Sequence, residues 1–226
     1  RDSFFFAQKD LEKKKILITA GPTYEKIDPV RFIGNYSSGK MGFALAEACA
    51  ERGAEVTLVA GPVSLKTHHP AIKRIDVESA GEMYQAAMTA FPSSDAAILC
   101  AAVADYRPEN ASEQKIKRET EREMTLHLVP NPDIAASLGA IKREGQVMVG
   151  FALETNDEAT HAEGKLKRKN LDFIVLNSLR DQGAGFRCDT NKITIIDNAG
   201  GVTSYPLKTK REVACDIVNK LVTLLK

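Results

Sequence analysis

Apolar runs of strand length alternate with helical patterns through the first hundred residues. Residues 15–20 (KILITA), 55–60 (EVTLVA), 73–77 (KRIDV) and 95–102 (DAAILCAA) are short runs rich in apolar and β-branched residues, which predicts four strands. Between the first two strands, apolar residues from 39 to 52 recur at helical spacing. The sequence therefore predicts strands connected by helices on one chain.

The helices have recognisable ends in the sequence. Gly53 follows the first helix, as a glycine does after a helix C-terminus. Ser79 and Glu82 have the spacing of a capping box and predict a helix that runs to about residue 90. Thr209 is the predicted N-cap of a closing helix that runs to residue 225.

The second half continues the alternation less regularly. Its predicted strands and helices are a strand at 124–129, a helix at 132–142, a strand at 147–153, a polar helix at 157–169 and a strand at 172–177. Residues 192–197 and 202–206 flank an Asn-Ala-Gly-Gly turn, which predicts a C-terminal hairpin.

Continuous apolar strands connected by helices are typical of a parallel sheet covered on both faces. We therefore predict an α/β protein with a Rossmann-like three-layer fold and a mainly parallel central sheet. Residues 107–123, called here the charged flap, contain three Arg, two Lys and five Glu. Their weak periodicity predicts a mobile flap or an exposed excursion, for which a solvated loop is the simplest interpretation.

The N-terminal residues, the net charge and the lengths of the apolar runs limit the possible domains and partners of this protein. Residues 1–14 have a short apolar patch followed by charge and are predicted to be a linker from an upstream domain, with one domain at 15–226. The formal net charge of +1 gives no global field for nucleic acid or an anionic membrane, so neither is expected as a partner. No apolar run approaches the length of a bilayer-spanning helix.

Cysteine and histidine spacing does not predict a metal or disulfide framework. The four cysteines, at 49, 100, 188 and 215, contain no C-x-x-C pair, and the four histidines form no cluster with them at metal-ligand spacing. We expect no protein-built metal site, and free thiols favour a reducing cytoplasm.

The segment between the first strand and first helix carries candidate chemistry. Ser37, Ser38 and Gly39 open the helix, where free N–H groups and the helix dipole suit a phosphate, although a simple capped helix start explains the string at least as well. The segment has neither the G-x-G-x-x-G nor the P-loop spacing. Asp105 follows a strand and is a candidate for a ribose, a base amino group or a metal, or for a turn cap.

Several ordered motifs resemble the phosphopantothenoylcysteine synthetases, or phosphopantothenate–cysteine ligases, of coenzyme A biosynthesis. The motifs are ITAGPT (18–23), Asp28 to Arg31 with NYSSGKMG (35–42), AAVADY (101–106), KIK (115–117), NPDI (131–134), GFALET (150–155), and Lys165 with Lys169 before NLD (170–172). Bacterial members resemble the C-terminal half of a bifunctional flavoprotein whose N-terminal half is a decarboxylase, and such an upstream domain would carry FMN.

The resemblance implies a two-step reaction. The carboxylate of 4′-phosphopantothenate attacks the α-phosphate of CTP, pyrophosphate leaves, and the amine of cysteine then displaces CMP from the acyl-cytidylate. Mg²⁺ is expected to accompany the triphosphate because it neutralises phosphate charge. CTP, rather than ATP, and a homodimer are likewise implied by the resemblance.

The resemblance also assigns roles to residues. Asn35 and Lys115 are implied as catalytic, Asn35 in cysteine transfer and Lys115 over the α-phosphate. The residues implied to bind phosphopantothenate are Arg31 (reaching from the neighbouring subunit), Ser37, Ser38, Gly39, Ala101 and Ala102. The residues implied to bind the nucleotide are Asp105, Lys115, Asn131, Pro132, Asp133, Ile134, Phe151, Lys165 and Lys169.

Two other classes of protein stay open from the residues alone. An NAD(P)-dependent Rossmann oxidoreductase is disfavoured because the dinucleotide glycine motif is missing and because the only Tyr with Lys four residues later is Tyr36, whose Lys40 lies in the candidate phosphate segment. A non-catalytic nucleotide-binding module predicts CTP binding without release of pyrophosphate.

Overall fold

A computed structural model describes residues 9–118, 123–154, 158–178 and 188–225. Its centre is an eight-stranded sheet in the order β13-β12-β10-β9-β6-β1-β4-β5. The strands of this sheet are β1 (Lys15–Ala20), β4 (Glu55–Ala60), β5 (Ile72–Asp76), β6 (Ala96–Leu99), β9 (Val147–Glu154), β10 (Phe173–Ser178), β12 (Ile193–Asp197) and β13 (Val202–Ser204).

The sheet is parallel from β5 to β10 and antiparallel at its C-terminal edge. β1 lies between β4 and β6 and is parallel to both, and β9 and β10 continue the parallel order. The hairpin of β12 and β13 adds the two antiparallel strands. The predicted mainly parallel sheet with a C-terminal hairpin is confirmed.

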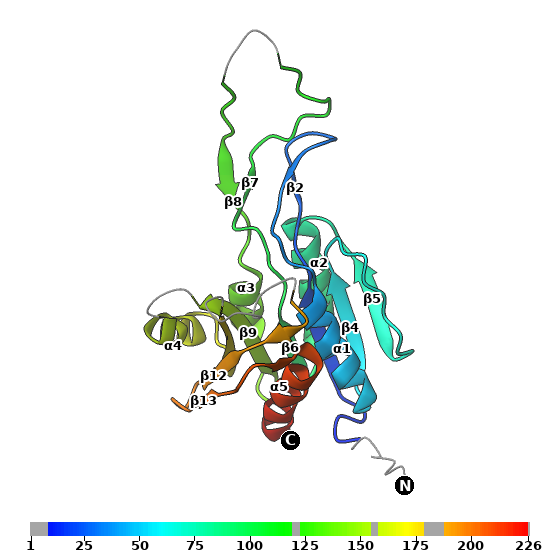
Figure 1. Cartoon of the computed structure of the whole chain (residues 1–226), viewed down its shortest axis with the longest axis vertical. Helices are drawn as coiled ribbons and strands as arrows, with labels where there is room; N and C mark the ends of the chain where they lie inside the picture. The colour runs from blue at the N-terminus through cyan, green and yellow to red at the C-terminus, as the bar shows by residue number, and fades with distance from the viewer. Residues whose placement is uncertain (1–8, 119–122, 155–157, 179–187, 226) are drawn as a thin grey trace.

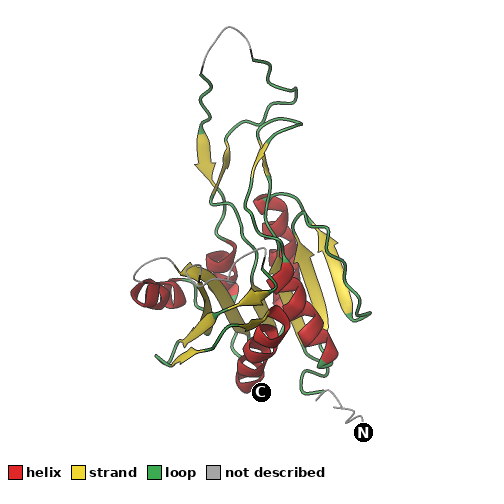
Figure 2. Ribbon diagram, in the orientation of Figure 1, coloured by secondary structure: helices red, strands yellow, loops and turns green. Residues whose placement is uncertain are grey.

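Helices cover both faces of the sheet, as Figure 2 shows. They are α1 (Lys40–Glu51), α2 (Ala80–Ala90), α3 (Ile134–Ile141), α4 (Glu158–Arg168) and α5 (Lys210–Leu224), with a short 3-10 turn at Phe91–Ser93. Ile16, Ile18 and Ala20 pack with α1 and α5, whereas Leu17 packs with α2, α3 and α4. Successive side chains of β1 thus enter two cores on opposite faces, which is the predicted three-layer arrangement.

The predicted helix caps lie where expected, with one change. Thr209 and Glu212 form a complete capping box at α5. The Ser79 hydroxyl accepts the Glu82 N–H at 3.1 Å, but the Glu82 carboxylate accepts the N–H of Glu78 at 2.7 Å and not that of Ser79. In the predicted capping box the glutamate therefore accepts the N–H of the residue before the N-cap, and not that of the N-cap itself.

The charged flap rises away from the sheet, as Figure 1 shows. Its base is an antiparallel pair, β7 (Tyr106–Pro108) with β8 (Leu128–Pro130), beside a second pair, β2 (Glu25–Lys26) with β3 (Phe32–Ile33). The predicted strand at 124–129 is wrong in its bounds, because only residues 128–130 have a strand partner. The flap is described except for residues 119–122.

The segment before β1 packs on the domain from residue 9 onward. Leu11 is fully buried in the α1–α5 core, and its N–H donates to the Arg52 carbonyl at 3.1 Å. Asp10 and Arg52 form a bidentate ion pair. Residues 1–8 of the predicted linker lie outside the described residues. In the part of the chain that is described, no helix is long and apolar enough to cross a membrane.

Candidate functional site

The site lies where β1 and β6 end side by side. After β1 the chain passes to β4 and β5 on one side, and after α2 it returns to β6 on the other, so β1 and β6 flank the point where the strand order reverses. Ligands of open α/β sheets bind beyond the carboxyl ends of strands at such a point. A ligand site is therefore expected at the two loops that follow these strands, 21–39 and 100–105.

Hydrogen bonds hold these two loops together. The Ala102 N–H donates to the Gly21 carbonyl at 2.9 Å, and the Thr23 N–H donates to the Ala102 carbonyl at 3.3 Å. The buried Thr23 hydroxyl accepts the Ala104 N–H at 2.9 Å. Ala102 thus has its backbone engaged with the first loop, and it lines neither of the two cavities described next.

A cavity of about 490 Å³ opens on the α3–α4 side of the loops. Eight residues predicted to bind a nucleotide line it, from four separate segments of the chain. They are Asp105, Asn131, Pro132, Asp133, Ile134, Phe151, Lys165 and Lys169. Ala101, predicted to bind substrate, lines the same cavity.

Asn131 is held in place by the surrounding backbone. Its Nδ2 donates to the Ala104 carbonyl at 2.8 Å and to the Glu25 carboxylate at 3.2 Å, and its N–H donates to the Asp105 carbonyl at 2.8 Å. Glu25 is 2% exposed and also accepts the Ala80 N–H at the start of α2. Sequence reasoning missed Glu25 because nothing in its local pattern distinguishes a buried acid from an exposed one.

Asp133 and two lysines form the charged wall of this larger cavity. Asp133 is the N-cap of α3 and accepts the Ala136 N–H at 3.0 Å. Burial raises the pKa of this carboxyl, but the Ala136 bond and the ion pair with Lys169 outweigh it and hold the pKa below its ordinary value. Lys169 lies just past the end of α4, and its N–H still donates to the Lys165 carbonyl, so the predicted neighbourhood of the two lysines is present.

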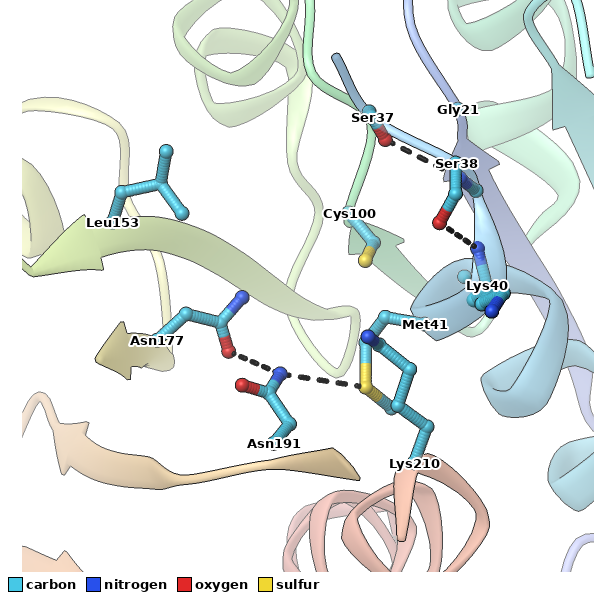
Figure 3. A pocket seen from close by; sticks show the side chains of 12 residues that line it. Gly21, Ser37, Ser38, Lys40, Met41, Cys100, Leu153, Asn177, Asn191 and Lys210 are labelled. Atoms are coloured by element: carbon cyan, nitrogen blue, oxygen red, sulfur yellow. Dashed lines mark hydrogen bonds between the residues drawn. The ribbon is translucent and has the colours of Figure 1, made fainter. Parts of the chain in front are cut away.

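A smaller cavity, of about 40 Å³, lies at the N-terminus of α1, and Figure 3 shows its lining. Ser37, Ser38 and Gly39 line it, as does Cys100, the residue before Ala101. The Ser37 hydroxyl accepts the Gly39 N–H at 3.3 Å, and the Ser38 hydroxyl accepts the Lys40 N–H at 3.4 Å. The predicted phosphate segment therefore borders a cavity of its own, separated from the larger one by the segment Cys100–Ala101.

Three polar residues of the smaller cavity were not predicted from the sequence. Asn177 lies on β10, Asn191 lies on β11 (Thr190–Asn191), and Lys210 is the first residue of α5. The strand β11 pairs with β14 (Lys208–Thr209) just before α5. The Asn191 Nδ2 donates to the Asn177 Oδ1 at 2.9 Å. Lys210 is 7% exposed, donates to the Cys188 carbonyl, and has its pKa lowered by burial. The predicted Thr209 cap correctly places the start of α5. The packing of α5 on α1 brings Lys210 to the same cavity as Ser38 (Figure 3).

Besides Ala102, three predicted residues lie outside both cavities. Asn35 is exposed, and its Oδ1 accepts the Ser37 N–H at 2.9 Å. Arg31 pairs with Asp28 and donates to the Ile116 carbonyl at 2.6 Å. Lys115 is an exposed residue of the charged flap, away from the larger cavity of the same chain. Their predicted roles stay predictions.

The described residues contain no group of three or more His, Cys, Asp or Glu arranged to hold a metal ion. Of the carboxylates at the larger cavity, Asp133 already accepts a helix N–H and pairs with Lys169. The donor set of this cavity therefore suits a metal whose ligands come mainly from a bound phosphate chain.

The fold and the paired cavities at the switch point define an α/β protein of the Rossmann-like class, a class whose ligands bind beyond the strand ends. The chain belongs to the family described as the DNA/pantothenate metabolism flavoprotein C-terminal domain, which matches residues 11–225. The resemblance found in the sequence is thereby confirmed.

Similar proteins agree with this family. The chain is 50% identical to the coenzyme A biosynthesis bifunctional protein CoaBC of Vibrio parahaemolyticus, over 98% of this chain and 55% of that protein. It is 57% identical to a cysteine/cysteine sulfinic acid decarboxylase of an unknown prokaryotic organism, over 99% of this chain and 63% of that protein. The crystal structure of the C-terminal domain of a CoaBC protein has a TM-score of 0.82 at 39% identity, over 96% of this chain and 98% of that one. The chain thus spans about half to two thirds of the length of the curated relatives.

Proposed function

We propose that this chain is a phosphopantothenoylcysteine synthetase, which joins 4′-phosphopantothenate to cysteine through an acyl-cytidylate. The observation that carries the proposal is the gathering of eight predicted nucleotide residues around one cavity, beside a second cavity suited to a phosphate. Cys100 lines the smaller cavity, and the next residue, Ala101, lines the larger one. An extended substrate with a phosphate at one end and a carboxylate at the other needs two such sites.

The larger cavity is the proposed nucleotide site. Lys165 and Lys169 supply positive charge toward a triphosphate, and Asp105 and Asn131 supply polar groups toward the ribose and base. The loops and the helix start at Asp133 hold these groups in fixed positions. Catalysis of phosphoryl and nucleotidyl transfer depends mainly on such positioning and on charge stabilisation. CTP as the nucleotide follows from the resemblance.

The smaller cavity is the proposed site of the substrate phosphate. Ser37, Ser38 and Gly39 bring the N-terminus of α1 to its wall, and Lys210 brings a buried cation to the same wall. A helix N-terminus and a lysine both favour an anion. The amide of Asn35, at the start of this segment, is the proposed donor to the acyl oxygen during cysteine transfer.

Mg²⁺ is proposed to enter with the nucleotide and to supply charge neutralisation at the phosphates. Asp105 is the carboxylate of the larger cavity best suited to approach it, because Asp133 is engaged with Lys169 and the α3 backbone. The remaining ligands would be phosphate oxygens and water, which Mg²⁺ prefers at nucleotide sites.

A homodimer is proposed as the functional assembly. Large apolar side chains are exposed on β3 and the loop before it, on β7 and β8, and just after the charged flap. They are Val30 (62% exposed), Phe32 (48%), Tyr106 (55%), Met124 (52%) and Leu128 (40%). Exposed apolar patches of this kind mark protein interfaces. Contact there would carry Arg31 toward a neighbouring subunit, in line with its predicted role.

The bifunctional relatives suggest a further partner. CoaBC proteins are named as bifunctional and are almost twice as long as this chain. We propose that a decarboxylase domain with bound FMN, fused or associated, supplies the other activity. The cytoplasm is the proposed location of the assembly.

A pyrophosphate-release assay tests the function. The chain is mixed with 4′-phosphopantothenate and each of the four nucleoside triphosphates, with and without cysteine. The proposal expects release with CTP, and CMP formation that requires cysteine. CTP binding without pyrophosphate release would support the non-catalytic module. Oxidation of NAD(P)H would support the oxidoreductase, and release of CO₂ from cysteine would support the decarboxylase named among the relatives.

A further inference from the structure

The Asp28 carboxylate lies between two segments far apart in the sequence. Its side chain is fully buried, although it belongs to a loop between two short strands, β2 and β3. One segment is the turn that contains Asp28 itself and ends at Arg31. The other is the charged flap near Ile116, 88 residues away in the chain. A buried carboxylate is tolerated only when its oxygens are fully engaged, so its partners indicate what it holds.

Asp28 accepts hydrogen bonds from both segments. Oδ1 accepts the N–H groups of Val30 and Arg31, each at 2.8 Å. Oδ2 accepts the Arg31 Nε at 3.0 Å and Nη2 at 2.5 Å, together with the Ile116 N–H at 3.1 Å. The guanidinium and these N–H groups hold the pKa of Asp28 far below its ordinary value, so the carboxylate stays charged.

Arg31 also hydrogen-bonds to Ile116. Its Nη2 donates to the Ile116 carbonyl at 2.6 Å while the Ile116 N–H donates to Asp28. Both backbone polar groups of one flap residue are therefore held by one ion pair. A further bond, from the Ser112 N–H to the Ile27 carbonyl at 2.9 Å, joins the flap to the same loop.

The held peptide is the one that joins Lys115 to Ile116. A peptide unit is planar, so a fixed Ile116 N–H also fixes the Lys115 carbonyl and limits the directions open to the Lys115 side chain. Hydrogen bonds to a charged carboxylate are about twice as strong as neutral ones, which suits a restraint on an otherwise exposed segment.

We propose that Asp28 is a positioning residue for Lys115. Asp28 holds the N–H of the Lys115–Ile116 peptide while Arg31 holds the Ile116 carbonyl, and Asp28 does so without touching the reactants. This inference rests on the proposed function and on the role over the α-phosphate that the resemblance implies for Lys115. It identifies the Asp28–Arg31 pair as the reason that the flap lysine has a defined place.

The first test is the backbone exchange of Ile116 in the whole chain. Asp28→Asn should raise the hydrogen-exchange rate of the Ile116 N–H by about tenfold or more, because the charged acceptor of this N–H is replaced by a neutral amide. Asp10→Asn is the matched control, since Asp10 forms a similar bidentate pair with Arg52 near the start of β1. It should leave Ile116 unchanged. An Ile116 rate in Asp28→Asn equal to that of the wild type overturns the proposal.

The second test asks whether Asp28 acts through Lys115. Asp28→Asn should lower the kcat of pyrophosphate release by about tenfold, with the KM for phosphopantothenate changed less than about twofold, as expected when an interaction made in the transition state is lost. In a Lys115→Gln background, Asp28→Asn should add no further loss, because coupled residues are non-additive. If the kcat losses of Asp28→Asn and Lys115→Gln multiply in the double variant, Asp28 acts independently of Lys115 and the proposal is overturned.

A backbone variant tests the same restraint in case Asp28→Asn fails to fold. Ile116→Pro deletes the donated N–H and leaves Asp28 intact, so it should reproduce the kcat loss, while Ile116→Ala keeps both backbone groups and should behave as the wild type. Equal activity of the two variants counts against the proposal. If the wild-type chain releases no pyrophosphate, the proposed function fails, and the exchange rate of Ile116 still decides whether Asp28 holds the flap.

Discussion

Gly61 lies directly against Pro22, so closely that a Cβ on Gly61 would stand 1.7 Å from the Pro22 carbonyl oxygen. Gly61 follows β4, and Pro22 belongs to the loop after β1, next to Gly21, which lines the smaller cavity. The Gly61 N–H also donates to the Ala20 carbonyl at 2.9 Å. The close approach of these two backbones holds the loop after β1 in place.

Gly61→Ala should therefore destabilise the fold. The neighbouring atom is backbone and has no room to move, so a loss of about 3 kcal/mol is expected from overpacking. Urea unfolding followed by circular dichroism measures it. Gly81→Ala is the control: its Cβ would meet only the Ser79 hydroxyl, at 3.7 Å, and alanine suits helix α2 better than glycine. Equal unfolding midpoints for the two variants would contradict this prediction.

Lys165 and Lys169 should contribute unequally to nucleotide affinity. Lys169 is paired with Asp133 at 3.0 Å, and a triphosphate must compete with that carboxylate. Among the described residues no ion pair of Lys165 is found. Lys165→Ala should therefore weaken CTP binding by about tenfold, the loss of one bond to a charged group, and Lys169→Ala by less. Calorimetric titration with CTP measures both, and the reverse order would refute the assignment.

Lys210 should select substrates that carry a phosphate. Lys210→Ala is expected to raise the KM for 4′-phosphopantothenate by about tenfold, because a charged hydrogen bond is lost. The KM for pantothenate, which lacks the phosphate, should not change. Lys208→Ala is a matched control, because Lys208 lies two residues away and pairs with Asp216 at 2.7 Å. A similar change with both substrates would place the phosphate elsewhere.

Asn35→Ala should separate the two half-reactions. The side chain is held by the Ser37 N–H at the start of the phosphate segment, and its amide is suited to an acyl oxygen. We expect cysteine transfer to fall by about a hundredfold, as on loss of an oxyanion donor, while pyrophosphate release falls much less. A chase of the trapped intermediate with cysteine measures the transfer. Equal losses in both steps would argue against this role, and Asn198→Ala, in the β12–β13 turn, is the control.

The Asp28 restraint should depend on pH in one direction. The folded-state pKa of this carboxyl is lowered from 3.8, so its contribution to stability is complete above the ordinary pKa and is lost as the pH falls toward the folded-state value. Asp28→Asn should therefore unfold at lower urea than the wild type at pH 7, and the gap should narrow below pH 4. A gap that widens in acid would show that the sign is wrong.

Much of the secondary structure could be predicted because local patterns decide it. β1 and β4 have the bounds predicted from their apolar runs, and Thr209 caps α5 as its sequence indicates. The strand predicted at 124–129 fails because alternation alone supplies no partner strand, and only the base of the flap finds one. Strand formation depends on a neighbour, which sequence spacing does not name.

The sequence by itself determined the fold class, through its predictable strands and helices, and the family, through its ordered motifs. The residues that gather around the larger cavity were implied by that resemblance. Only the tertiary structure brought Lys210 and Asn191 to the serines before α1, and Asp28 to Ile116. Packing of α1 on α5 and the folding of the flap onto the β2–β3 loop decide those contacts. The physical reason is that hydrogen bonds between distant segments depend on how whole elements pack, whereas helix caps and strand runs depend on neighbours in the chain.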